Sequence, residues 1–159
     1  MRIPRLLLPL VAFLATFTGC ATDFKLSDIS VSIVSIRPIS ATALETQASM
    51  TLRFTNANVL AIGVDGTTHK LYLNGTYVGQ AVNNEAVGLP PLGTTTADIT
   101  IQLENLALVK QLLKSANEQS ATYRLDSRLY VRAGEDWQNY NCSQQGSVDL
   151  QALAAAVGR

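Results

Sequence analysis

Apolar and polar residues alternate with a period of two along most of the chain. The alternation is clearest in three stretches, residues 48–54, 97–103 and 123–131. A period of two places apolar side chains on one face of a β-strand and polar side chains on the other. Each stretch is therefore predicted to be a strand with one buried face. In residues 29–36 the apolar phase changes near Ile33, which predicts a bulge at that point.

A tight hairpin is predicted at Asn74 and Gly75. Asn-Gly favours a type I′ turn because both residues tolerate a positive φ. The two-residue loop predicts a register that pairs Leu73 with Thr76, Tyr72 with Tyr77 and Leu71 with Val78. The two tyrosines would then form a cross-strand aromatic pair, which we interpret as packing rather than as a platform for stacking sugars.

One internal helix is predicted after the strand that ends near Leu103. Its apolar residues have helical spacing, and they are Leu106, Val109, Leu112 and Leu113. We expect this helix to pack on the sheet or to cap one end of it, with Lys110 and Lys114 outside. The sequence Gly-Leu-Pro-Pro-Leu-Gly at 88–93 predicts a turn, since proline does not fit a central strand. Asp149 is predicted to cap a short helix near the C-terminus.

These elements predict a single, mostly β domain. Seven or so short strands with one inserted helix favour an antiparallel β-sandwich of the immunoglobulin or fibronectin III kind. A small closed barrel is the alternative, because periodicity alone does not separate the two folds. A chain of 159 residues is long enough for one sizeable core and short for two.

The N-terminal residues have the features of a secretion signal. Arg2 and Arg5 precede an apolar run of about a dozen residues, which suits a signal and is too short for a transmembrane helix of roughly 20 residues. Thr18-Gly19-Cys20 resembles the lipobox of bacterial lipoproteins, so Cys20 is predicted to carry the lipid. The predicted organisation is a signal peptide at 1–19, a lipidated tether at 20–27 and the domain at 28–159. By the same resemblance, Ala21 implies the periplasmic face of the outer membrane, with palmitate among the lipid chains.

Charge and candidate chemistry narrow the function further. Without Arg2 and Arg5 the chain has 10 basic residues (12 minus 2) and 12 acidic residues, scattered in sequence, which argues against nucleic-acid binding. His69 is the only histidine and is predicted to be a solvated loop residue. With Cys20 lipidated, Cys142 is expected to be a small buried residue on a strand. Glu135 and Asp136 are expected in a hairpin turn. We therefore expect no enzyme activity, no cofactor and no metal.

The order of these features resembles a known family. A strand ending at Arg37-Pro38, a long strand running into Asn56-Ala57-Asn58, the Leu-Asn-Gly turn at 73–75 and the Pro-Pro turn at 90–91 are similar to group 2 late embryogenesis abundant proteins. The folded core of those proteins is called the water-stress and hypersensitive-response domain. The family commonly has Asn-Pro-Asn where this chain has Ala57 in the middle. The resemblance implies an immunoglobulin-like fold and assigns structural roles to Asn56, Asn58, Asn74 and Gly75.

The resemblance also implies a function. We expect a membrane-anchored, non-catalytic envelope protein that protects proteins or membranes against desiccation or other stress. Two alternatives stay open: an interaction module that binds an envelope partner by strand addition at a sheet edge, and a carrier of an apolar ligand. The sequence does not identify the client or partner, the oligomeric state or the role of Cys142.

Overall fold

Eight antiparallel strands and one helix make up the fold. The computed structural model describes residues 28–115, 120–133 and 136–149. The elements are β1 (Ile29–Ala41), β2 (Glu45–Asn56), β3 (Ile62–Leu73), β4 (Thr76–Asn83), β5 (Val87–Leu89), β6 (Gly93–Glu104), α1 (Asn105–Ser115), β7 (Ser120–Ala133) and β8 (Asp136–Asp149). The predicted mostly β domain with one inserted helix is confirmed. The helix predicted after Asp149 lies outside the described residues.

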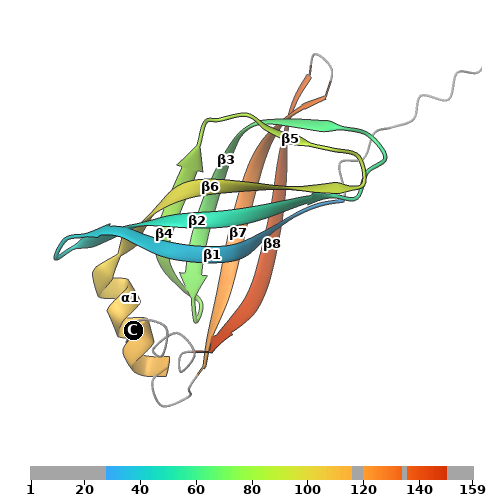
Figure 1. Ribbon diagram of the computed structural model, residues 1–159. Coiled ribbons are helices and arrows are strands. Elements are labelled where there is room, and N and C mark those ends of the chain that lie inside the picture. Colours follow the sequence, from blue (N-terminus) through green and yellow to red (C-terminus); the bar gives the residue numbers. More distant parts are fainter. Residues whose placement is uncertain (1–27, 116–119, 134–135, 150–159) are drawn as a thin grey trace, which may run out of the picture.

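All eight strands belong to one hydrogen-bonded sheet. Its order is β1-β2-β6-β4-β3-β7-β8, and the short strand β5 pairs with β3. The sheet curls, so that β1, β2 and β6 cross in front of β3, β4, β7 and β8 (Figure 1). The buried side chains from both halves meet between them, with Met50, Leu52 and Phe54 from one half and Val64, Leu125 and Leu129 from the other.

The two halves of the sheet are joined at a short pairing between β4 and β6. Only three residue pairs form it: Gly79–Leu103, Gln80–Gln102 and Ala81–Ile101. By comparison, β2 and β6 pair along twelve residues and β7 and β8 along fourteen. A Cβ atom at Gly79 would overlap the backbone oxygen of Gln102 and lie 2.8 Å from the side chain of Leu103. Glycine is therefore required here, because the two backbones approach too closely for any other residue.

The predicted immunoglobulin-like sandwich is not confirmed. A sandwich of that kind consists of two separate sheets, whereas hydrogen bonding here runs continuously through the β4–β6 junction. The described strands do not form a closed barrel either, since their order begins at β1 and ends at β8. Alternation along single strands cannot reveal this arrangement, because it gives the buried face of a strand and not its neighbours.

Local predictions from the sequence agree with the strands in most places. The register of β1 against β2 shifts between Ile33 and Ser35, as the change of apolar phase predicted. Asn74 and Gly75 have φ values of 48° and 76°, and Tyr72 lies opposite Tyr77. The predicted pairing of Leu71 with Val78 is wrong, because an irregularity after Leu71 places it opposite Gly79.

We predict that Gly79→Ala destabilises the protein by about 1–3 kcal/mol, because the added methyl group has to push β4 and β6 apart. Chemical denaturation followed by circular dichroism measures this change. Gly88→Ala is the matched control: a Cβ at Gly88 meets nothing within 4 Å, so this variant should unfold like the wild type. Equal stabilities for the two variants would show that the β4–β6 junction tolerates a side chain.

Candidate functional site

Helix α1 buries two polar residues against the protein and exposes three of its large apolar residues to solvent. Gln111 and Ser115 are buried, whereas Leu106, Val109 and Leu113 are 84%, 51% and 70% exposed. The prediction that the helix packs on the sheet is confirmed, because Ala107 and Leu108 pack against the core, but Leu106, Val109 and Leu113 of the predicted stripe face solvent. The prediction that Lys110 and Lys114 are exposed is confirmed, and both lie on the same outward side as the stripe.

Directional hydrogen bonds explain why the helix faces this way. The Gln111 amide donates from Nε2 to the Thr76 hydroxyl at 2.8 Å, and the Asn74 amide donates to the Ser115 hydroxyl at 2.5 Å. Rotating the stripe inward would remove both partners and leave buried polar atoms unsatisfied. Asn74 also accepts from the backbone N–H of Thr122 at 2.9 Å, so one turn residue connects the helix to β7.

The first residue of α1 is fixed to the hairpin between β1 and β2. The backbone N–H of Asn105 donates to the Leu44 carbonyl at 3.0 Å, and its amide donates to the Thr42 carbonyl at 2.8 Å. The Thr46 hydroxyl donates to Asn105 Oδ1 at 2.7 Å. These bonds place Leu44, which is 79% exposed, next to the start of the helix and therefore near Leu106.

The result is a surface that we call the apolar end, made of Leu44, Leu106, Val109 and Leu113. The helical part lines a shallow hollow of about 430 Å³ together with Lys110 and Lys114. Covering these four side chains would contribute on the order of 5 kcal/mol of hydrophobic free energy. Clustered exposed apolar side chains of this kind mark an interaction site. We therefore regard the apolar end as the candidate functional site.

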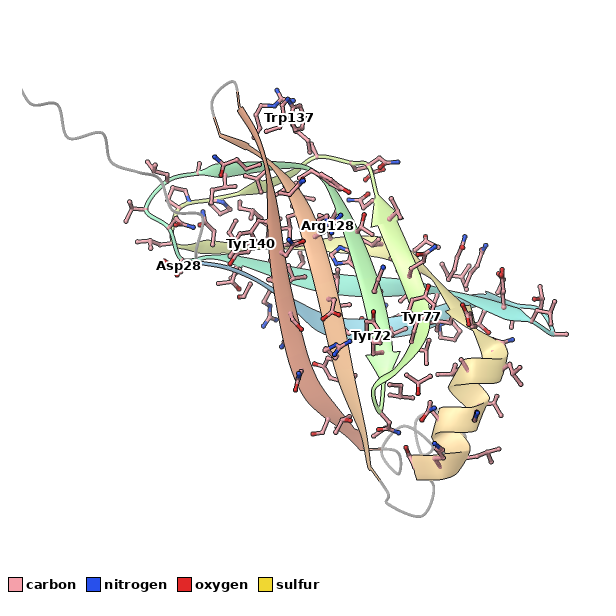
Figure 2. All side chains as sticks on the ribbon, turned by 180° about the vertical axis from the view of Figure 1, so that it is seen from behind. Asp28, Tyr72, Tyr77, Arg128, Trp137 and Tyr140 are labelled. Atoms are coloured by element: carbon pink, nitrogen blue, oxygen red, sulfur yellow. The ribbon has the colours of Figure 1, made fainter. Side chains whose placement is uncertain are left out.

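The face of β3, β7 and β8 that carries Tyr72 and Arg128 (Figure 2) has a second hollow, of about 490 Å³. Three arginines lie in a row along β7. The guanidinium of Arg124 is 3.2 Å from Asp126, that of Arg128 donates to Asn141 at 3.1 Å, and that of Arg132 is 2.7 Å from Asp65. Each of the three arginines has a partner within the sheet, so the row has a structural role and needs no ligand to account for it.

The tyrosine pair belongs to the same face. The rings of Tyr72 and Tyr77 meet edge to face with centroids 5.9 Å apart, and the guanidinium of Arg124 lies 4.2 Å from the centre of the Tyr72 ring. A sugar-stacking platform needs a free aromatic face, and Arg124 covers one face of Tyr72. The interpretation of this pair as packing fits these contacts.

His69 lies in the core, and the prediction of a solvated loop residue is wrong. Residues 65–70 are part of β3, and the His69 side chain is 0% exposed. Its Nδ1 is 2.8 Å from the Ser127 hydroxyl and its Nε2 is 2.8 Å from the Thr67 hydroxyl. Burial lowers the pKa of His69 to about 4, so the ring is neutral at pH 7. The sequence predicted a loop here because the residues next to His69 are polar, and that pattern does not indicate a buried side chain.

The asparagine after β2 organises the neighbouring loops. Asn56 is buried, and its amide donates to the carbonyls of Leu60 and Pro90 at 2.8 and 3.0 Å. Its Oδ1 accepts from the backbone N–H of Asn58 at 2.9 Å and from the Asn58 amide at 3.0 Å. These bonds hold the end of β2 against the Pro-Pro turn. Both the nitrogen and the oxygen of the Asn56 amide bond to neighbouring loop residues, so the side chain has a structural role.

The two cysteines differ in what the structure describes. Cys142 lies on β8, is half-buried and packs against the core. Burial raises the pKa of its thiol, and hydrogen bonds from the Val31 backbone and Ser127 oppose that shift. Cys20, the predicted lipid attachment site, lies outside the described residues.

The described residues, which are 28–115, 120–133 and 136–149, bear on metal binding and on membrane crossing. Within these ranges, His, Cys, Asp and Glu form no group of three or more that could bind a metal ion. The helix described there is too short to cross a membrane.

Comparison with known proteins gives the family. The sequence profile of the family described as late embryogenesis abundant protein matches residues 51–138, which is more than half of the chain. The chain belongs to the late embryogenesis abundant protein family. No curated protein has a significant sequence match to this family member.

Two solved structures are similar to this member of the family. A protein from Arabidopsis thaliana, determined in solution, aligns with 13% identity over 75% of this chain and 80% of its own, with a TM-score of 0.61. A crystal structure from Archaeoglobus fulgidus aligns with 21% identity over 74% of this chain and 97% of its own, with a TM-score of 0.49. The first match supports the fold.

We predict that the stability of this protein falls as the pH decreases from about 6.5 to 4, in part because of His69. The unfolded chain binds a proton near pH 6.5, whereas the folded protein binds it only near pH 4. Stability from the neutral ring is thus fully present above pH 6.5 and is lost toward pH 4, by about 3 kcal/mol. Urea denaturation at a series of pH values measures the loss. His69→Gln should flatten this dependence, and an unchanged slope in that variant would contradict the assignment.

Proposed function

We propose that this chain is a lipid-anchored, non-catalytic protein of the cell envelope that protects proteins or membranes during water loss. Membership of the late embryogenesis abundant family supports a role in stress or desiccation. In finer detail, the chain is proposed to carry a domain of the group 2, water-stress and hypersensitive-response kind. The observation that carries the proposal is the apolar end, because it offers a binding surface that requires no reaction chemistry.

The architecture of the apolar end suits a protective role. Its side chains are held outward by bonds at three points of α1, namely Asn105, Gln111 and Ser115. The surface therefore exists before any partner binds, and binding requires little reordering of the protein. A protector that acts when water is withdrawn has to offer its surface at once, and a surface fixed by the fold meets that requirement.

The lipid anchor is proposed to be Cys20, at the periplasmic face of the outer membrane. The described fold begins at Asp28 and β1 starts at Ile29. The proposed tether of residues 20–27 would therefore connect the lipid directly to β1. Asp28 and the β1–β2 hairpin lie at opposite ends of β1 (Figure 2), so this arrangement leaves the apolar end accessible.

A second candidate function is supported by the edges of the sheet. In the described part of the chain, β1 and β8 are the outermost strands, and each pairs on one side only. Val34 and Ile36 of β1 are partly exposed apolar residues on an edge strand. An extended segment of an envelope partner could pair with such an edge by strand addition.

We predict that a palmitate analogue labels the full-length protein in a bacterial host and that the label follows the outer membrane. Cys20→Ala should abolish labelling, because the thiol is the acceptor. Cys142→Ala should be labelled like the wild type and serves as the control. Equal labelling of wild type and Cys20→Ala, or wild type without label in the soluble fraction, would contradict the anchor.

We predict that the purified full-length protein preserves a labile enzyme or dye-filled vesicles when they are dried together and rehydrated. Recovered enzyme activity and retained dye are the two readouts. Leu106→Ser with Leu113→Ser should lower the protection, because it removes exposed apolar surface without touching the core. Val82→Ser is the matched control, since Val82 is an exposed apolar residue on β4. Unprotected enzyme and unprotected vesicles in the presence of wild type would contradict the function.

A further inference from the structure

We propose that the apolar end docks into the surface of an anionic phospholipid membrane. The inference rests on the proposed function, since it names the partner of the apolar end. Leu44, Leu106 and Leu113 would insert among the acyl chains, and Lys110 and Lys114 would contact the lipid headgroups.

The first argument is the protrusion of the apolar side chains from the surface. Leu106 and Leu44 are the two most exposed of the large apolar side chains described, and they come from two different elements.

The second argument is the distribution of charge on α1. Its outward side carries Lys110 and Lys114 among the apolar residues, and the sequence of the helix contains no acidic residue. An amphipathic helix with lysines beside its apolar stripe is typical of proteins that lie in the interface of anionic membranes. Lysine side chains suit this position because their methylene stems lie along apolar surface while the ammonium groups stay in water. Two exposed acidic residues, Glu45 and Glu104, lie opposite each other in register at the edge of the apolar end, next to Leu44 and Asn105.

The third argument is size. Four apolar side chains with two lysines fall well short of the roughly 20 to 30 residues that each partner contributes to a standard protein interface. A bilayer requires no complementary shape, and a small protruding cluster can insert into it. A lipid surface therefore fits the apolar end better than a folded protein partner does.

The position of the apolar end fits attachment of the protein at two points. β1 has 13 residues and spans roughly 43 Å between Asp28 and the hairpin. The proposed tether from Cys20 to Asp28 spans at most about 27 Å. With Cys20 in the same membrane as the apolar end, β1 would lie closer to parallel than to perpendicular to the bilayer.

The test places a fluorescent reporter on α1. The full chain carries Cys20→Ser, so that no lipid is attached, together with Leu106→Trp and Trp137→Phe. Trp137 is the only natural tryptophan and lies at the far end of β7 and β8 from α1 (Figure 2), so the chain that keeps it gives the background. Vesicles contain phosphatidylglycerol with brominated acyl chains or, for comparison, brominated phosphatidylcholine. We expect a blue shift and bromine quenching of the residue 106 emission on phosphatidylglycerol, both weakened by salt.

The full chain keeps the apolar run at residues 6–17, which could attach to vesicles by itself. Two variants of α1 separate insertion of the apolar end from that attachment, because the run is the same in all chains. Adding Val109→Asp and Leu113→Asp should lower partitioning by tenfold or more. Adding Lys110→Glu and Lys114→Glu, both at exposed positions, should weaken binding to phosphatidylglycerol only. Emission from residue 106 that stays unchanged with both vesicle types would overturn the inference. The inference would also be overturned if the emission of residue 106 shifted with an unfolded client protein and with neither vesicle type. In that case, protection of the enzyme during drying would still support the proposed function.

Discussion

The close approach of β4 and β6 at Gly79 is the constraint on which the rest of the structure depends. Three residue pairs connect the two halves of the sheet, and the backbones there leave no room for a side chain. This junction makes one continuous sheet curl over its own apolar face. It also sets the position of α1, because the helix continues directly from the end of β6 and packs beside the start of β4.

Polar residues of α1 then decide which side of the helix meets solvent. Asn105, Gln111 and Ser115 bond to the hairpin, to β4 and to the β3–β4 turn. Their bonds are directional, whereas hydrophobic burial is not, so a few buried polar groups outweigh the preference of the apolar stripe for the core. The exposed apolar end is therefore a consequence of how the fold satisfies its hydrogen bonds.

Much of the fold could be predicted from the sequence, because alternation with a period of two determines which face of each strand is buried. The strands around Met50, Ile101 and Leu129, the Asn74–Gly75 turn and the helix after Glu104 follow from local patterns. Strand order could not be predicted, since the pairing of β4 with β6 depends on contacts between residues far apart in sequence. The two sheets expected for a sandwich are for this reason replaced by a single curled sheet.

The candidate site was only half visible in the sequence. Leu106, Val109 and Leu113 were recognised as one stripe, but an apolar stripe normally faces a core, and the burial of Gln111 and Ser115 was missed. The spacing of Ala107, Gln111 and Ser115, at intervals of four residues, is a pattern of small and polar residues suited to close packing. His69 was predicted to lie in a loop because its neighbours in sequence are polar. One of these polar neighbours, Thr67, is buried and bonds to His69, and the other partner, Ser127, lies far away in sequence.

The central claim is that the apolar side of α1 faces solvent in the free protein. Nuclear magnetic resonance with a soluble gadolinium chelate tests it directly, because the chelate relaxes methyl groups that it can approach. The account predicts strong relaxation of the Leu106 and Leu113 methyls, weaker relaxation of Leu108 on the inner side of the same helix, and little for Leu125 in the core. Protection of Leu106 and Leu113 equal to that of Leu125 would contradict the account.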